Sequence, residues 1–434
     1  MGFWRDRRRL SRALDRAGVR HALRAEGDQL VVDLHPHPAN LARAQAALAE
    51  WPALAAWLAA TPRPAHVQVA NVKLTAALCP QTDAERDEES ALVAAMSANP
   101  DDDAPRLVYA DRLIARGDPL GELIVLQCTP GRDAEERAER ILARSWQTLA
   151  ADVAPFAEHA ITLRRFRFVR GFIERVYMTV DAFVEHGARV FGDYPTRTLE
   201  IIDSVPDCAR LASSRALSRV PRLVMHPVWS VTLAPLAAGA FDRLEDLELH
   251  LYNASSDDRT ADDFAWASTV RAPLLSRIDV SNRTTAFTSG FAANPNLPRL
   301  RHYREHVGYA EADQDFTSAY GALAHRHALE SLHLSHSEGR AGDDALLPFF
   351  APDTPSALRE LSLMSTGVTD RFLREIARSP KLRLLEEFAF HEPAITAAGL
   401  AEVVTAATGL VSFRASSSDP EVAAVAASWH ASRG

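Results

Sequence analysis

The sequence predicts an α/β protein in which a solenoid of parallel strands and helices follows a helical module and a small α+β unit. Leucine-bearing, strand-like segments recur at nearly constant spacing through the second half of the chain. Short amphipathic helical stretches precede them, and the first part mixes strand and helix patterns. The 434 residues exceed what one hydrophobic core usually organises. We therefore expect three parts, at residues 1–80, 81–160 and 161–434.

The first part has the patterns of an α+β unit. Residues 4–17 carry apolar side chains at helical spacing. The segment "VRHALRAEGDQLVVDLHP" contains two short apolar runs around Gly27 and Asp28, which predicts a hairpin. A second helical stretch and the strand-like "HVQVANVKL" follow. These elements predict a small unit that ends near Pro80.

The second part predicts four short helices. The polar, acidic connection "QTDAERDEE" leads into a helix that Asn99 and Pro100 end. A second helix ends at Gly117, a third begins near Leu123, and residues 133–150 form a charged amphipathic fourth. The side chains expected on the inner face of the second helix are Leu107, Ala110, Leu113 and Ile114.

The third part contains a repeat. It begins with residues 163–180, which are rich in aromatic and β-branched side chains and predict a strand, and a helical segment at 181–191 follows. Nine later segments then match L-x-x-L-x-L with varying fidelity, and we take the middle position of each as its anchor. Successive anchors are 24 to 31 residues apart, close to the length of stacked strand-and-helix repeats. The anchors are Leu199, Leu223, Leu247, Ile278, Tyr303, Leu332, Leu361, Phe388 and Phe413.

The best copies of the repeat are "LEDLEL", "LESLHL" and "LRELSL". Over roughly residues 195–416 the chain resembles the leucine-rich repeat family, especially its ribonuclease-inhibitor-like branch. The resemblance implies a leucine-rich repeat solenoid in which a strand, a short polar turn and a helix alternate. The asparagine that the family places after the strand is replaced here by Tyr252, Ser337 and Thr366. We therefore expect irregular turns at these positions.

Residues 101–103 are three adjacent aspartates before a helical segment. A calcium loop of the EF-hand type would need a glycine at its sixth position and a glutamate at its twelfth, where this chain has Arg106 and Arg112. A catalytic carboxylate pair would need an apolar cleft that shifts one pKa. We therefore predict that Asp102 or Asp103 caps the helix that follows.

The surrounding stretch "ALVAAMSANPDDDAPRLVYADRLIARGDPLGELIVLQ" is similar to the bacterial repeat-companion domain, a short helical module found beside leucine-rich and other repeats. The family often has a tryptophan where this chain has Arg112, and "FVRGFIERV" resembles the segment that joins the module to its repeats. The resemblance implies an architecture and carries no known activity. The matching residues are Asp102, Asp103, Pro105, Arg106, Leu107, Val108, Tyr109, Ala110, Asp111, Arg116, Gly117, Asp118, Pro119, Gly121 and Glu122.

Charge and hydropathy exclude two classes of protein. A net charge of -9 argues against a nucleic-acid coat, because binding phosphates needs clustered Lys and Arg. In "LRRFRFVRGF" arginines interleave with phenylalanines, but strand alternation separates the two kinds onto opposite faces, so we expect no nucleic-acid binding. Arg43, Glu50 and Pro52 interrupt the most apolar stretch, and we expect no membrane span. The amino terminus has charges where a signal peptide needs an apolar run, which favours the cytoplasm.

No motif indicates a metal, a cofactor or catalysis. Cys79, Cys128 and Cys208 are too far apart in sequence for a zinc or redox motif. We expect solvated or turn histidines at the close pairs, because no cysteine or carboxylate set accompanies them. No nucleophile-and-base motif or glycine-rich phosphate loop occurs. The histidine pairs are His35 and His37, His325 and His327, and His333 and His336.

The repeat predicts one polar surface. In each strand the anchor and the residue two beyond it point inward, so the residues one before, one after and three after the anchor share the other face. That face is polar, of mixed charge and rich in histidine. The residues expected to bind a partner there are Asp246, Glu248, His250, Arg277, Asp279, His302, Arg304, His306, His333, Glu360, Glu387, His391 and Arg414, with Ser331 beside them.

We therefore expect a non-enzymatic scaffold or sensor that binds a protein partner through the concave face of the solenoid. Its histidines predict an affinity that depends on pH near about 6 to 7. An ordinary solvated sheet face would show the same pattern. One alternative is a regulatory or adaptor subunit of a bacterial signalling or defence assembly, which differs only in its partner. The other is an enzyme whose active site lies in residues 1–80, where "HPHP" and many arginines occur.

Overall fold

The fold comes from a computed structural model. The predicted helix at residues 4–17, the pair His35 and His37, and Cys79 lie outside the residues that the structure describes. The described residues are 21–26, 29–34, 72–75, 83–115, 118–149, 167–193, 195–203, 205–225, 233–251, 261–282, 286–308, 315–337, 341–417 and 419–432.

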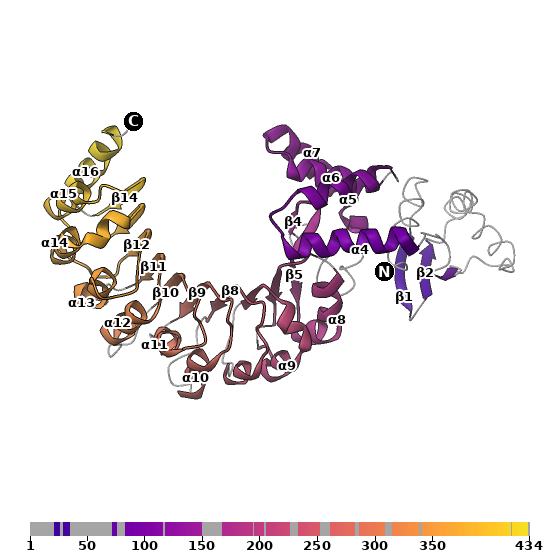
Figure 1. The fold of residues 1–434 in the computed structure, drawn as a ribbon, viewed down its shortest axis with the longest axis horizontal. Coiled ribbons are helices and arrows are strands. Elements are labelled where there is room, and N and C mark those ends of the chain that lie inside the picture. Colours follow the sequence, from indigo (N-terminus) through magenta and orange to yellow (C-terminus); the bar gives the residue numbers. More distant parts are fainter. Residues whose placement is uncertain are drawn as a thin grey trace. The chain divides into compact units, whose positions relative to one another are not determined.

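Strands and helices alternate along most of the described chain (Figure 1). The strands are β1 (His21–Glu26), β2 (Gln29–Leu34), β3 (Val72–Thr75), β4 (Arg167–Val169), β5 (Phe172–Met178), β6 (Thr198–Ile201), β7 (Arg222–Met225), β8 (Asp246–His250), β9 (Arg277–Asn282), β10 (His302–Val307), β11 (Ser331–His336), β12 (Glu360–Met364), β13 (Glu387–His391) and β14 (Ser412–Ser416). The helices are α4 (Asp83–Ala98), α5 (Ala104–Ala115), α6 (Pro119–Cys128), α7 (Arg132–Leu149), α8 (Val180–Asp193), α9 (Cys208–Ser213), α10 (Ala261–Thr269), α11 (Ala286–Ala293), α12 (Phe316–Arg326), α13 (Gly342–Leu346), α14 (Asp370–Arg378), α15 (Ala397–Ala406) and α16 (Pro420–Ala431).

The described strands form two sheets. The first has the order β1-β2-β3 and is antiparallel, which confirms the predicted hairpin and the strand within "HVQVANVKL". The second has eleven described strands in the order β14 to β4, and it is mostly parallel. The chain divides into two compact units, residues 1–177 with 189–196, and residues 178–188 with 197–434. The three-part division drawn from the sequence stays a prediction.

Four helices, α4 to α7, form the helical module of the first unit, as the sequence predicts. Leu123 and Ile124 of α6 are fully buried at its centre. The predicted inner face of α5 is wrong in part, because Leu107 and Ile114 are 39% and 48% exposed. The buried side of α5 instead includes Tyr109, and the Tyr109 ring stacks on the Phe172 ring with centroids 6.0 Å apart. Successive residues of a helix are 100° apart around its axis, so a helix that buries Tyr109 directs Leu107 and Ile114 away from the core.

The three aspartates have two different roles. Asp102 Oδ1 accepts a hydrogen bond from the backbone N–H of Ala104 at 2.9 Å, which confirms the predicted cap. Asp101 and Asp103 instead form ion pairs with Arg170, at 3.3 and 3.2 Å. Arg170 also donates to the backbone carbonyl of Pro100 at 2.7 Å. The loop before α5 is therefore tied to a residue about seventy positions further along the chain.

Arg170 lies in a turn that the sequence did not predict. The expected single strand at 163–180 is wrong, because Arg170 and Gly171 have φ angles of 50° and 83° and join β4 to β5 as an antiparallel hairpin. Positive φ at both central residues is the requirement of a tight two-residue hairpin turn. Gln127 holds this turn, since its side chain accepts from the Gly171 N–H at 2.7 Å and donates to the Phe168 carbonyl at 3.1 Å.

In the second unit, the nine described strands β6 to β14 form one parallel ladder in sequence order, which confirms the predicted repeat spacing. All nine anchors, from Leu199 to Phe413, stand in register with their neighbours and are buried. Within this unit the strands line the inner side of a curve and the helices line the outer side (Figure 1). The α/β class is confirmed, and membership of the leucine-rich repeat family stays a prediction. Among the described helices, none combines the length and the apolar character needed to cross a membrane.

One inward position holds a glutamate. Glu305 stands two residues beyond the anchor Tyr303 and is fully buried. Its carboxylate accepts from the Thr288 hydroxyl at 2.7 Å and from the Tyr320 hydroxyl at 2.8 Å. The Tyr320 oxygen also lies 2.9 Å from Nε2 of His336. These hydrogen bonds satisfy a carboxylate that would otherwise be costly inside an apolar core.

The expectation of a solvated or turn histidine is wrong for His336, whereas His327 lies in the turn after α12 but is buried there. His336 and His327 are 4% and 5% exposed, not solvated. His327 Nε2 lies 3.1 Å from the carbonyl of Phe291, and His336 bonds Tyr320. Burial is the main cause that lowers the pKa of both, and it takes the pKa of His336 to about 4.

Candidate functional site

The polar side chains of the second unit form three rows on the sheet. On strands β8 to β14, the residue before each anchor, the residue after it and the residue three after it lie opposite the inward positions, as the sequence predicts. We call this surface the polar sheet face. Parallel register aligns each position across neighbouring strands. The row before the anchors contains Arg222, Asp246, Arg277, His302, Ser331, Glu360, Glu387 and Ser412.

The other two rows complete the face. All of the residues predicted to bind a partner lie on one of the three rows. The row after the anchors contains Glu248, Asp279, Arg304, His333, Ser362, Ala389 and Arg414. The row three after the anchors contains His250, Ser281, His306, Ser335, Met364, His391 and Ser416.

A pocket of about 160 Å³ opens on the first two rows. It is smaller than the roughly 300 Å³ or more of an ordinary small-molecule site. The structure brings together seven of the residues predicted to bind a partner with Ser331, which was expected beside them, and it adds Arg222. The seven are Asp246, Arg277, Asp279, His302, Arg304, His333 and Glu360.

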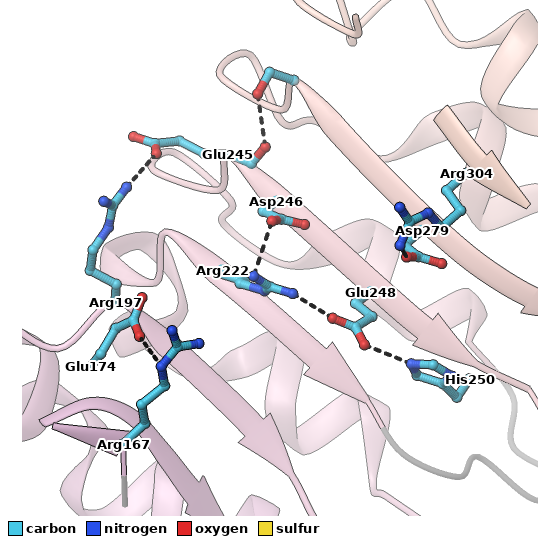
Figure 2. A network of polar contacts seen from close by, with 11 residues as sticks. Arg167, Glu174, Arg197, Arg222, Glu245, Asp246, Glu248, His250, Asp279 and Arg304 are labelled. Carbon is cyan, nitrogen blue, oxygen red and sulfur yellow. Dashed lines mark hydrogen bonds and ion pairs between the residues drawn. The ribbon is translucent and has the colours of Figure 1, made fainter. Parts of the chain in front are cut away.

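At one end of the face, Arg222 holds two carboxylates (Figure 2). Its guanidinium lies 2.6 Å from Glu248 and 3.5 Å from Asp246. Glu248 also bonds His250 at 2.7 Å. The hydrogen bond from His250 and those from Arg222 lower the pKa of Glu248 to about 2. Burial has the opposite effect on Asp246 and raises its pKa.

The next strands carry a looser pair and an exposed arginine. Asp279 and Arg304 approach to 3.5 Å (Figure 2), and burial raises the pKa of Asp279. Arg277 lies between Asp246 and His302 in the first row and is exposed. Among the described residues, its guanidinium makes no hydrogen bond or ion pair. The face therefore presents a cation that its own side chains leave available.

The histidines of the pocket differ from the expectation drawn from the sequence. Burial lowers the pKa of both His302 and His333, and the nearby arginines add to this effect. Glu360 lies 3.6 Å from Nε2 of His333, and a hydrogen bond from Ser331 is the main cause that lowers its pKa. At neutral pH the two imidazoles are therefore uncharged. The predicted pH dependence near 6 to 7 moves to lower pH for these two residues.

The remaining predicted residues lie on the face outside the pocket. His306 Nδ1 is 3.1 Å from the Ser335 hydroxyl, and His391 Nδ1 is 2.7 Å from the Ser416 hydroxyl. Both histidines are exposed. Glu387 and Arg414, on β13 and β14, are also exposed.

Two features were missed by sequence reasoning. Arg222 directly precedes the anchor Leu223 and so lies in the same row as Asp246. The residues predicted to bind a partner began one repeat later, at Asp246. A rim of ion pairs also runs along the residues two before the anchors, and an alternation of basic and acidic residues at that position was its signal. The pairs are Arg197 with Glu245, Arg301 with Glu330, and Arg359 with Glu386.

The arrangement can bind charged groups of both signs. In the described part of the chain, no group of three His, Cys, Asp or Glu side chains is placed to hold a metal ion. Cys128 and Cys208 are not joined in a disulfide within the described residues, and the Cys128 thiol donates to Asp103 Oδ1 at 3.5 Å. The alternative enzymatic site in residues 1–80 involves side chains that the structure does not describe.

Two comparisons with known proteins were made without a match. A scan against protein-family models found no match to this chain. A search of curated proteins found none either.

Proposed function

We propose that this protein is a non-enzymatic scaffold or sensor of the leucine-rich repeat type that binds a protein partner through its polar sheet face. The observation that carries the proposal is the alignment of charged side chains from successive repeats into continuous rows on a curved parallel ladder. Stacked repeats of this kind create extended binding surfaces. The mixed charges favour a partner that also carries both signs.

The test uses the full chain as bait in an extract of its native host. The variant Glu248→Ala with Arg304→Ala removes one acid and one base from the polar sheet face. The matched control, Glu375→Ala with Arg378→Ala, removes an exposed ion pair from α14 on the helix side. We expect captured partner proteins to be retained by the wild type and the control and reduced at least tenfold with the first variant. Equal capture by all three would refute the proposal.

A further inference from the structure

The charges of the polar sheet face do not all cancel one another. Arg222 is matched by Asp246 and Glu248, and Arg304 is matched by Asp279. With Arg277 included, the three arginines and three carboxylates on this face of strands β7 to β10 balance in number. Arg277 nevertheless stands outside these ion pairs, and so do two glutamates further along the same row.

The first exception is Arg277, which is exposed and makes no hydrogen bond or ion pair with another described residue. The second lies further along the same row, where Glu360 and Glu387 stand on adjacent strands. Among the described residues, Glu360 bonds Ser331 and lies 3.6 Å from Nε2 of the half-buried His333, whose pKa is lowered by burial. Glu387 is exposed, and within the described residues it forms no ion pair.

The two ends lie on one line. Parallel register joins Arg277 to His302, His302 to Ser331, Ser331 to Glu360, and Glu360 to Glu387. Strands in a sheet are roughly 4.8 Å apart, so about 14 Å separate the Arg277 and Glu360 backbones. His302 and Ser331 form the floor between them, and burial lowers the pKa of His302, so the floor is neutral at neutral pH. A positive end and a negative end thus flank an uncharged centre.

We infer, on the basis of the proposed function, that this row binds an extended segment of the partner protein that places a carboxylate at Arg277 and a Lys or Arg side chain at Glu360 and Glu387. Alternate side chains of an extended segment share one face at roughly 6.6 Å intervals, so residues four apart span about 13 Å. An acidic and a basic residue at this spacing reach both ends of the row. The guanidinium of Arg277 can bind a carboxylate through two parallel hydrogen bonds.

The size of the pocket supports a side chain as the occupant. At about 160 Å³ it lies directly over the row, and Arg277, His302 and Glu360 are among its lining residues. This volume suits one side chain of a peptide better than a whole small molecule. The charges at its two ends would then fix the direction of the bound segment.

The probe is a displayed library of random twelve-residue peptides, selected on the immobilised full chain. The wild type should enrich peptides that carry an acidic and a basic residue four positions apart in one fixed order. The Arg277→Glu variant should lose the preference for the acidic residue, and Glu360→Lys with Glu387→Lys should lose the preference for the basic one. An enriched peptide should bind Arg277→Glu at least tenfold more weakly than the wild type. Arg277 and Glu387 are exposed and Glu360 is partly exposed, so the substitutions change the polar sheet face and not the buried core.

The matched control is Arg326→Glu, which reverses an exposed arginine on α12 at the helix side and should select the same peptides as the wild type. The triple reversal should bind the peptide in which the acid and the base are exchanged. Enriched peptides without the charge pair, identical selection by Arg277→Glu, or no enrichment at all would each overturn the inference. The proposed function fails separately, if the Glu248→Ala and Arg304→Ala variant keeps its captured partners.

Discussion

Glu392 lies one repeat beyond Thr366, and its buried carboxylate accepts hydrogen bonds from both the backbone N–H and the hydroxyl of Thr366, at 2.6 and 2.7 Å. It also accepts from the Gly367 N–H at 3.1 Å. Thr366 occupies the position where the resembled family has asparagine. The next repeat therefore supplies the acceptor for this turn.

Replacing Glu392 by Ala should destabilise the last repeats by about 2 to 4 kcal/mol, because three donors would lose their acceptor in a buried site. Hydrogen exchange of the amides of residues 360–392 measures the local loss. The control Glu402→Ala, an exposed glutamate on α15, should leave the exchange rates unchanged. Equal protection in the Glu392 and Glu402 variants would contradict this role of the carboxylate.

Alanine substitutions at two glycines should have opposite effects. At Gly171 the φ angle is +83°, and an added Cβ would lie 2.0 Å from Cγ1 of Ile124. Gly171→Ala should therefore destabilise the helical module by about 2 to 4 kcal/mol. At Gly321, within α12, the nearest atom to an added Cβ is 3.9 Å away, so Gly321→Ala should stabilise by up to about 1 kcal/mol. Thermal unfolding of both variants measures the two signs, and a neutral Gly171→Ala would show that the hairpin turn is not constrained.

The Arg222 and Glu248 side chains should be energetically coupled. They are 34% and 18% exposed and 2.6 Å apart, so solvent screens their attraction only in part. A double-mutant cycle with Arg222→Ala and Glu248→Ala, measured by urea unfolding, should give a coupling energy of about 1 to 2 kcal/mol. The rim pair of Arg359 and Glu386 is more exposed, and the same cycle there should give below about 1 kcal/mol. Equal coupling in the two pairs would disagree with the burial of the first.

Acid should destabilise the protein through His336. Its pKa is about 4 in the folded chain against an ordinary value of 6.5, so the unfolded chain takes up the proton first as the pH falls. This contribution to the free energy of unfolding is fully present above about pH 6.5 and is lost progressively toward about pH 4, by roughly 3 kcal/mol in total. In the variant His336→Gln this loss should disappear from the pH dependence of the urea midpoint. The exposed His325→Gln should keep the wild-type profile, and superimposable profiles for wild type and His336→Gln would disprove the assignment.

Much of the candidate site was predictable because strand alternation and repeat spacing are local properties of the sequence. Once Leu247 and Leu361 were taken as anchors, the exposed positions of each strand followed, and the register of the ladder matches them. The ion pairs between side chains of the polar sheet face could not be predicted from the strand pattern. The sequence offers Arg277 and Arg304 as equivalent cations, and only the structure shows that Arg304 lies 3.5 Å from Asp279 whereas Arg277 makes no hydrogen bond or ion pair among the described residues.

The errors have a common physical cause. The burial of Leu107 and Ile114 was assigned from helical periodicity, which identifies an apolar stripe but not the direction in which the helix is turned. Tyr109 packing on Phe172 decides that direction. His336 looked solvated because it follows a polar strand, yet Tyr320 from the preceding helix covers it.

The sequence by itself determined the parallel ladder, its nine aligned anchors and the polar composition of one sheet face, since these depend on the order of side chains along each strand. Only the tertiary structure decided that Arg170 binds Asp101 and Asp103, that Glu305 is buried among hydroxyl groups, and that burial lowers the pKa of His302 and His333. Ion pairs, buried hydrogen bonds and pKa shifts depend on atoms that distant parts of the chain bring within a few ångströms, and the local pattern does not encode these distances.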